Sequence, residues 1–275
     1  MQDMHFTVFG GDKRLEYTAQ HLRDEGYTVT EKAGEATDPP QTPLVILPVP
    51  MTRDSEHVYA PAAREPMPLQ MLAALLPEQT QVFCGMAKEA ANLFYRRGIR
   101  LYDYAQRDEF AIRNAVPTAE GVAEILLRAL PSTVQGSHIL ITGYGRTARA
   151  CARLLDRMGA QITIAARRCS ALASADAAGY TGLYLREMHR FMQRFDAVVN
   201  TVPAPVLLER ELAAMRHDCP LVEIASAPYG TDFEAAQKHG ISVQIAPSLP
   251  GRIAPKTAGI ILADTVLHIL REGNP

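Results

Sequence analysis

Two glycines one residue apart, Gly143 and Gly145, stand where an apolar run gives way to a helical pattern. Residues 139–142 are typical of a buried strand, and residues 146–158 are expected to form a helix. In such a turn the first glycine permits the bend, the second lets a pyrophosphate approach the main chain, and the small Ala148 lets the helix pack near the strand. Amides at the helix start would face the phosphates. The stretch predicts a dinucleotide-binding turn, although similar turns also occur without a ligand.

The next strand decides which dinucleotide is expected. Residues 161–165 fit a strand that ends at Ala166. This end lies about 20 residues after the glycine turn, where such folds place the residue that binds the ribose of the cofactor. NAD-binding chains carry Asp or Glu there, and this chain carries Arg167 and Arg168, with Ser170 close behind. A guanidinium group offers a bidentate, charge-assisted fork to a phosphate. We therefore expect NADP rather than NAD, with two solvated arginines as the alternative.

Composition narrows the class of protein. The 275 residues are enough for two domains, and 47% hydrophobic with 21% charged residues describes a globular chain. A net charge of -2 gives no support for a nucleic-acid or membrane surface. The amino-terminal residues lack the basic start of a secretory signal, so a cytoplasmic protein is expected. The four cysteines and eight histidines show no ligand spacing, and we expect reduced thiols and no metal.

Strand and helix patterns alternate along the whole chain, which is typical of a doubly wound parallel sheet. We expect two Rossmann-like α/β domains with mainly parallel sheets and a cleft between them. Residues 1–130 form an N-terminal substrate or partner domain, with helix 117–130 as a bridge. Residues 131–275 form the NADP-binding domain, whose last helix, 258–270, packs back on the first. The expected strands are 5–9, 27–30, 44–47, 81–84, 99–104, 139–142, 161–165, 195–203 with its turn, 221–226 and 241–245.

Ligands gather at the carboxyl ends of the strands in such sheets, so the turns there supply candidate residues. After the first strand, Gly11 and Asp12 either line a site or form a structural turn. The proline-rich stretch 52–68, which carries Thr52, Arg53 and His57, is either a substrate loop or a solvated excursion.

Three later segments also reach this edge. Pro117 suits a first helical turn, so Asn114, Thr118 and the helix amides are expected to face a substrate carboxylate, with ordinary capping as the alternative. The turn Thr201 to Pro203 lies at the switch point beside the cofactor. A rigid, proline-containing run over residues 246–257 then leads into the last helix.

The chain resembles the A-subunit of dipicolinate synthase along essentially its whole length. The resemblance rests on residues 10–12, 114–121, 143–147, 166–167, 200–203, 230–233 and 249–259. It implies oxidation of dihydrodipicolinate to dipicolinate with NADP⁺, in the mother-cell cytoplasm of sporulating bacteria, together with a flavoprotein-like B-subunit. The chain departs from the family pattern at Ala148, Tyr229, Arg252 and the 52–68 loop, and all but the first of these touch the expected substrate side.

A dicarboxylate requires cations or amides, and its aromatisation requires loss of a hydride and a proton. Lys256 is the first candidate for the substrate, because a lysine at a helix start opposes the helix dipole. His57, Asp12 and Glu120 are unranked proton acceptors. The candidate catalytic residues are Lys256, Glu120 and Asp12. The candidate substrate residues are Gly11, Thr52, Arg53, Asn114, Thr118, Ser226 and Thr257. The candidate cofactor residues are Gly143, Tyr144, Gly145, Arg146, Thr147, Arg167, Arg168, Ser170, Thr201, Val202, Pro203, Ser226, Leu249 and Pro250.

Two other functions fit part of the pattern. An NADP-dependent enzyme of the shikimate dehydrogenase type would share both domains and the arginine after the second strand. It would also carry a paired catalytic lysine and aspartate, of which this chain shows no counterpart. A cofactor-binding sensor or scaffold without chemistry would keep only the glycine turn.

Overall fold

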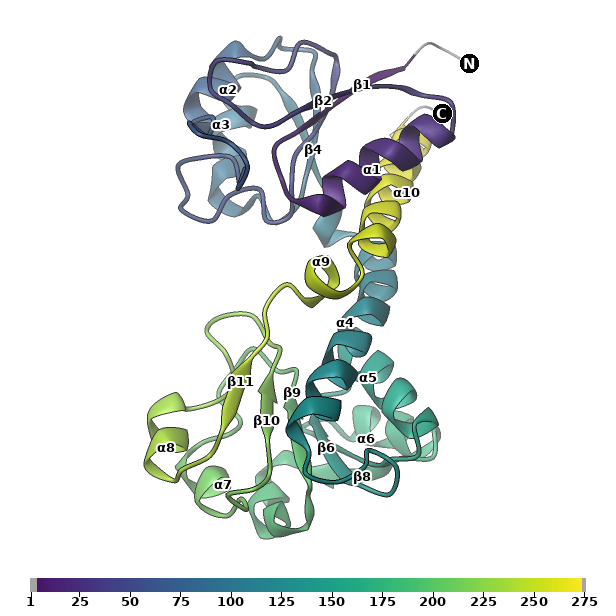
Figure 1. Ribbon diagram of the computed structural model, residues 1–275, viewed down its shortest axis with the longest axis vertical. Coiled ribbons are helices and arrows are strands. Elements are labelled where there is room, and N and C mark those ends of the chain that lie inside the picture. Colours follow the sequence, from purple (N-terminus) through teal and green to yellow (C-terminus); the bar gives the residue numbers. More distant parts are fainter. Residues whose placement is uncertain (1–3, 274–275) are drawn as a thin grey trace. The chain divides into compact units, whose positions relative to one another are not determined.

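The computed structural model describes residues 4–273 as two α/β units, each built on its own parallel sheet (Figure 1). Contacts assign the chain up to Asn114 and the segment from Ala254 onward to one unit, called here the N-terminal unit. Residues Ala115–Ile253 form the other, called here the central unit. The expected fold class, two doubly wound domains with parallel sheets, is confirmed.

The N-terminal unit has a five-stranded sheet in the order β2-β1-β3-β4-β5, with all pairs parallel. The strands are β1 (His5–Phe9), β2 (Thr28–Lys32), β3 (Leu44–Ile46), β4 (Gln81–Cys84) and β5 (Arg100–Asp103). The helices are α1 (Lys13–Asp24), α2 (Leu69–Leu75), α3 (Ala91–Tyr95) and α10 (Pro255–Gly273), with short 3₁₀ turns at Lys88–Ala90 and Tyr104–Gln106. The strand order reverses between β1 and β3, where such sheets bind ligands.

Alternation along β1 explains the two apolar layers of this unit. Phe6 and Val8 face the layer that holds α1 and α10, whereas Phe9 faces the layer that holds α2 and α3. Helices α1 and α10 lie side by side and run parallel, because Thr18 Oγ1 donates to Gly259 O at 3.0 Å and His21 contacts Asp264 at 3.0 Å. Their amino ends therefore lie at the same end of the unit.

The central unit has a six-stranded parallel sheet in the order β11-β10-β9-β6-β7-β8, which is the order of dinucleotide-binding folds. Its strands are β6 (His138–Thr142), β7 (Gln161–Ala166), β8 (Thr181–Tyr184), β9 (Ala197–Asn200), β10 (Leu221–Glu223) and β11 (Val243–Ile245). Its helices are α5 (Arg146–Arg157), α6 (Cys169–Asp176), α7 (Glu209–Ala213), α8 (Phe233–Lys238) and α9 (Leu249–Ile253), with 3₁₀ turns at Leu185–Arg190 and Met192–Arg194.

Helix α4 (Asp108–Ala129) corrects the expectation for residues 114–130. The sequence pattern predicted a helix start at Pro117, but the helix starts nine residues earlier and Pro117 lies inside it. An interior proline removes one helical hydrogen bond and costs about 3 kcal/mol. Buried Phe110, Ala115 and Val122 on both sides of it keep the helix intact. The amides near Thr118 are therefore not a helix end that could receive a carboxylate.

The division between the units differs from the expected boundary at residue 130. It falls within α4, because Val122, Ile125 and Leu126 belong to the same core as Ile139 and Ile141 of β6. The last helix, α10, was expected to start from the NADP-binding domain and pack back on the first domain. It belongs to the N-terminal unit, because its Ile261, Leu262 and Val266 pack into the core with β1 and α1.

Several short elements were missed from the sequence. Strand β8 and helices α6, α7 and α8 lie at the surface of the central unit, where much of each element is exposed and the apolar pattern is weak. The run 246–257, expected as a rigid, proline-containing segment that leads into the last helix, contains α9 and the start of α10. In the part of the chain that the structure describes, no helix has the length and apolar character needed to cross a membrane.

Candidate functional site

The glycine turn has the geometry that its residue types predict. Gly143 has φ +80°, a left-handed conformation that side chains rarely adopt, and its N–H donates to Ala165 O at 2.7 Å. A Cβ at this position would lie 2.9 Å from Val202 Cγ2 and 3.0 Å from Thr201 Oγ1. Gly145 is the N-cap of α5, and a Cβ there would meet nothing within 4 Å. The main chain at Gly145 is thus open to a ligand.

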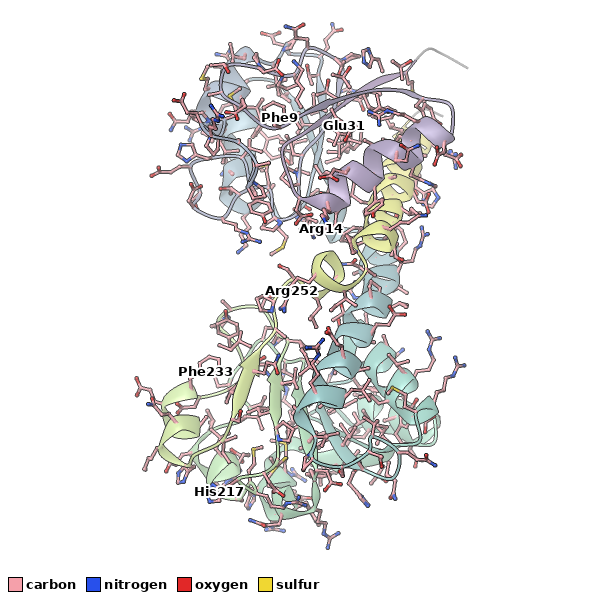
Figure 2. The ribbon with its side chains drawn as sticks, viewed as in Figure 1. Phe9, Arg14, Glu31, His217, Phe233 and Arg252 are labelled. Carbon is pink, nitrogen blue, oxygen red and sulfur yellow. The ribbon has the colours of Figure 1, made fainter. Side chains whose placement is uncertain are left out.

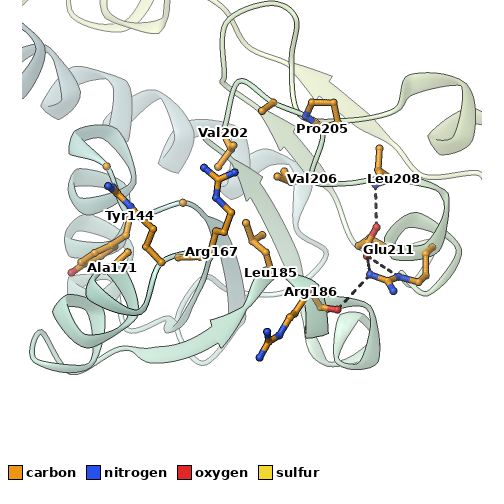
Figure 3. Close-up of a pocket in the computed structure, with 16 residues that line it drawn as sticks. Tyr144, Arg167, Ala171, Leu185, Arg186, Val202, Pro205, Val206, Leu208 and Glu211 are labelled. Carbon is orange, nitrogen blue, oxygen red and sulfur yellow. Dashed lines mark hydrogen bonds and ion pairs between the residues drawn. The ribbon is translucent and has the colours of Figure 1, made fainter.

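A cavity of about 510 Å³ lies beside this turn, at the carboxyl ends of β6, β7 and β9 (Figure 3). It occupies the switch point of the sheet, where dinucleotides bind in this type of fold. Its lining combines the glycine turn, the end of β7, the turn after β9 and the start of α7. The lining residues are Gly143, Tyr144, Gly145, Ala166, Arg167, Arg168, Ala171, Leu185, Arg186, Val202, Ala204, Pro205, Val206, Leu208, Arg210 and Glu211.

The wall of the cavity is basic. Arg167, Arg168, Arg186 and Arg210 contribute to it, opposed by the carboxylate of Glu211. Glu211 is engaged locally, because its Oε1 accepts from Arg210 Nη2 at 3.0 Å and its Oε2 accepts from the Leu208 N–H at 3.3 Å. Arg167 points into the cavity in Figure 3. Among the described carboxylates, none forms an ion pair with Arg167 or Arg168. These charges fit the phosphates of a dinucleotide.

The structure brings part of the expected cofactor set to this cavity. Gly143, Tyr144, Gly145, Arg167, Arg168 and Val202 line it, and the Thr201 hydroxyl donates to Thr142 O, directly before the turn, at 2.7 Å. Arg146 and Thr147 begin α5 and Ser170 lies in the first turn of α6, next to the lining residues. Pro203 and Ser226 are exposed in loops and do not line the cavity. Leu249 and Pro250 are buried in α9, where Leu249 packs against Gly121. The last two therefore have a packing role that the sequence did not reveal.

Sequence reasoning missed the opposite wall. Leu185 and Arg186 come from the 3₁₀ turn after β8, and Leu208, Arg210 and Glu211 come from the start of α7. The sequence carries no signal for these two elements, because both are short and their apolar residues follow no clear helical or strand period. Ala204, Pro205 and Val206 directly follow the Thr201–Pro203 turn, and that proximity is the signal that could have indicated them.

On the N-terminal unit, Asp12 is committed to an ion pair. Its carboxylate caps α1 and accepts hydrogen bonds from Nε and Nη2 of Arg14 at 2.8 Å, and Arg14 Nη2 also donates to Val49 O at 2.6 Å. Arg14 is labelled in Figure 2. Burial alone would raise the pKa of Asp12, but the hydrogen bonds and charge of Arg14 outweigh it and hold the pKa below its ordinary value. Asp12 is therefore a poor proton acceptor and a good clamp between the turns after β1 and β3.

The 52–68 loop contains a hollow of about 250 Å³ lined by Arg53, Asp54, His57 and Tyr59 among others. The Arg53 guanidinium lies 4.0 Å from the centre of the Tyr59 ring. Asp54 Oδ2 contacts His57 Nδ1 at 2.9 Å, and backbone hydrogen bonds from His57 and Glu56 lower the pKa of Asp54. Thr52 donates to Asp54 at 3.0 Å, so its hydroxyl organises the loop.

The remaining candidates separate into two groups. Lys256 and Thr257 are exposed in the first turn of α10, at the same end of the N-terminal unit as Gly11 and Asp12. Asn114 and Thr118 lie within α4 and are partly exposed. Glu120 lines a separate hollow of about 160 Å³ with Val116, Arg153 and Arg157, away from the glycine turn. This position does not support Glu120 as a proton acceptor at the cofactor cavity.

All four cysteines are free, and their surroundings predict selective reactivity. Burial raises the pKa of Cys151 and Cys219 to about 12, and it raises the pKa of Cys84 well above its ordinary value. Cys169 is exposed at the start of α6, directly after Arg168. We expect a thiol reagent at neutral pH to modify Cys169 rapidly in the native protein and all four thiols after denaturation. A second rapidly modified thiol in the native protein would contradict this assignment.

Two family models match the chain. One matches residues 5–105 and describes the N-terminal domain of the A-subunit of dipicolinate synthase. The other describes the NAD-binding domain of D-isomer specific 2-hydroxyacid dehydrogenases and matches residues 111–229, which include the glycine turn and all the residues that line the cavity. The second match agrees with a nicotinamide cofactor in the central unit.

Individual relatives agree with the first family model. The chain is 32% identical over 252 residues to the dipicolinate synthase A-subunit of Bacillus subtilis (strain 168), covering 90% of this chain and 85% of the relative. The crystal structure of the corresponding protein from Bacillus halodurans matches with a TM-score of 0.88 and 27% identity, covering 98% of each chain. The Bacillus subtilis crystal structure matches with a TM-score of 0.88 and 28% identity, covering 99% of this chain and 97% of the other.

Proposed function

Because the chain belongs to the family of dipicolinate synthase A-subunits, we propose that it oxidises dihydrodipicolinate to dipicolinate with NADP⁺ as the oxidant. The substrate loses a hydride and a proton, and its ring becomes aromatic. Bound nicotinamide supplies the hydride acceptor. The observation that carries the proposal is the open glycine turn beside a cavity whose β7 edge ends in Arg167 and Arg168 rather than in an acid.

The choice of NADP rests on those two arginines. An acidic residue at this position accepts hydrogen bonds from the ribose hydroxyls of NAD and would repel a 2′-phosphate. Arg167 and Arg168 instead offer positive charge at the cavity wall, and the one carboxylate in the lining, Glu211, is already paired with Arg210. A 2′-phosphate would therefore meet cations without displacing an existing ion pair.

The substrate carboxylates need cationic partners, and we propose Arg53 and Lys256. Tyr59 supports the Arg53 guanidinium from one face, which leaves its N–H groups available to a carboxylate. Lys256 stands in the first turn of α10, where backbone amides add to its attraction for an anion. Both belong to the N-terminal unit.

For the proton we favour His57 over Asp12 and Glu120. Asp54 holds the imidazole through Nδ1 at 2.9 Å, and this arrangement leaves Nε2 as the group that can accept a proton. Asp12 is paired with Arg14, and Glu120 lies in another hollow. His57 and Arg53 line the same hollow, so one residue can hold the substrate while the other takes its proton.

Variants of these residues should separate binding from chemistry. We expect Arg53→Ala to raise KM for the substrate by about 10- to 100-fold, because a charge-assisted hydrogen bond is lost. We expect His57→Asn to lower kcat by about 100-fold or more, with a smaller change in KM. Steady-state kinetics with Arg64→Ala as the control, an exposed arginine of the same loop, would check both. Unchanged kinetics in His57→Asn would remove it as the proton acceptor.

We further propose that the chain works with a flavoprotein-like B-subunit in the mother-cell cytoplasm during sporulation, as the family resemblance implies. The test is to follow NADPH formation from dihydrodipicolinate and NADP⁺ in the presence and in the absence of the B-subunit. Oxidation of shikimate instead would indicate the shikimate dehydrogenase type. Cofactor binding without turnover of either substrate, when both proteins are present, would indicate a sensor or scaffold.

A further inference from the structure

A buried polar network lies directly beneath the cofactor cavity, and the proposed reaction leaves it without a role. Thr142, Asn200 and Glu223 end the neighbouring strands β6, β9 and β10, and each is fully buried. The Thr142 hydroxyl donates to Asn200 Oδ1. Asn200 Nδ2 donates to both carboxylate oxygens of Glu223 at 2.7 Å. The network thus crosses the switch point of the sheet.

Glu223 is held by neutral donors alone. Besides Asn200, its carboxylate accepts from the Ala225 N–H at 3.0 Å, the Gly230 N–H at 3.3 Å and the Thr231 hydroxyl at 2.7 Å. In the part of the chain that the structure describes, no lysine, arginine or histidine forms an ion pair with it. A buried carboxylate without a cation is costly unless hydrogen bonds satisfy it, so these donors are arranged around an acceptor.

The carboxylate decides how the Asn200 amide is oriented. Since an ionised carboxylate only accepts, Nδ2 must face Glu223, and Oδ1 must then face the other way. There Oδ1 accepts from the Thr142 hydroxyl and from the Val202 N–H at 3.1 Å. Val202 lines the cavity, and its Cγ2 would lie only 2.9 Å from a Cβ added at Gly143. The amide orientation therefore fixes the cavity wall against the glycine turn.

The loop after β10 fixes the same wall from the other side. Gly230 O accepts from the Val206 and Leu207 N–H groups at 2.9 Å each. A Cβ at Gly230 would overlap with Asn200 Nδ2 and would lie 2.5 Å from Val202 O. Glu223 binds this loop through Gly230 and Thr231. The Glu223 carboxylate thus connects the cavity wall formed by Val202–Val206 to the ends of β10, β9 and, through Asn200, β6.

We propose that Glu223 is a positioning residue of the cofactor site, which sets the Asn200 amide and through it the turn that receives the dinucleotide. The proposal rests on the proposed function to the extent that this cavity binds NADP. Its central prediction concerns cofactor affinity rather than turnover. In Glu223→Gln, an NH₂ group replaces one carboxylate oxygen and faces donors, so Asn200 Nδ2 keeps one acceptor instead of two and the loop donors lose a partner.

The test is the dissociation constant of NADPH, measured by fluorescence titration of folded variants. We expect Glu223→Gln to weaken binding by at least tenfold and to raise KM for NADP⁺ while kcat changes little. A general loss of folded protein would instead lower kcat at constant KM. Glu234→Gln, an exposed glutamate of α8 in the same unit, is the matched control and should bind as the parent chain does.

A reciprocal exchange gives the second measurement. In Asn200→Asp combined with Glu223→Gln, the carboxylate stands at 200 and the amide at 223, so the oxygen in the place of Asn200 Nδ2 can accept from the new amide while Oδ1 keeps its donors. The donation from Nδ2 to Val202 O at 3.1 Å is not restored, so the recovery should be partial. We expect this double variant to bind NADPH more tightly than either single variant, even if Glu223→Gln alone folds poorly. Parent-like affinity in folded Glu223→Gln, or a double variant that fails to recover folding and binding, would overturn the proposal. A parent chain that binds no NADPH would overturn the proposed function itself.

Discussion

Replacing Arg167 by alanine is expected to weaken NADP⁺ binding by about 10- to 100-fold, because hydrogen bonds to a charged group contribute about 1.5–3 kcal/mol. NAD⁺ lacks the 2′-phosphate, so its affinity should change by less than about threefold. Arg167 points into the cavity from the end of β7, and the described carboxylates leave it without an ion pair. Titration of each variant with both cofactors measures the change in preference.

The arginine prediction has a matched control and a dependence on salt. Arg190→Ala removes an exposed arginine of the same unit that does not line the cavity, and it should alter neither affinity. Because the proposed contact with a 2′-phosphate would be ionic and solvent-accessible, the ratio of NADP⁺ affinity to NAD⁺ affinity should fall as ionic strength rises. An equal loss of both cofactors in Arg167→Ala would mean that Arg167 supports the pocket in general and does not select the phosphate.

Gly259→Ala is expected to lower the free energy of unfolding by about 1–3 kcal/mol, as overpacking of a well-packed core does. A Cβ at Gly259 would overlap with Arg14 O, and it would lie 2.8 Å from Tyr17 Cβ and 3.1 Å from Thr18 N. The backbones of α1 and α10 therefore approach each other so closely that only glycine fits. The alanine regains about 1 kcal/mol of helix propensity, so the observed loss is the net of both effects.

The same helix provides the control for that measurement. A Cβ at Gly273, the last residue of α10, would meet nothing within 4 Å. Gly273→Ala should therefore leave stability unchanged or raise it slightly. Urea unfolding followed by circular dichroism compares the two variants with the parent chain. If Gly259→Ala were as stable as Gly273→Ala, the close approach of α1 and α10 would be wrong, and with it the placement of Lys256, in the first turn of α10, at the same end of the unit as the amino end of α1.

The parts of the site that could be predicted depend on backbone geometry. Position 143 needs a positive φ and position 145 needs an open main chain, and glycine meets both needs. Arg167 follows this turn at the sequence distance where the fold binds the ribose. Each requirement can therefore be recognised from the residue type at its position. Parallel strands bring such turns to one edge of the sheet whatever their side chains are. This part of the cavity could therefore be predicted from the sequence, together with the two parallel sheets.

Where the prediction was wrong, tertiary packing overrode a local preference. Pro117 favours a helix start, yet buried residues on both sides extend α4 through it. Leu249 and Gly259 stand in 249–259, one of the segments on which the family resemblance rests. The structure gives both a packing role, Leu249 against Gly121 and Gly259 against α1. Arg186 and Glu211 line the cavity from short elements that hydrophobic periodicity in the sequence does not predict. Such contacts between distant segments leave no spacing to detect.

The substrate side is the hardest part of the site to predict from the sequence, because charged residues at a rim can bind a ligand or bind one another. Asp12 and Arg14 pair with each other, and Thr52 organises the turn around Asp54. Only the contacts in the structure separate these engaged residues from Arg53 and Lys256. The Arg53 guanidinium lies over the Tyr59 ring, and Lys256 lies in the first turn of α10.

The stoichiometry of the reaction tests the central claim most directly. Dihydrodipicolinate is generated under anaerobic conditions and mixed with NADP⁺, the purified chain and the B-subunit. Dipicolinate and NADPH are then quantified in the same sample. The account predicts that the two products appear together in a one-to-one ratio and that both depend on this chain. Dipicolinate formed without NADPH, or at the same rate when this chain is omitted, would contradict it.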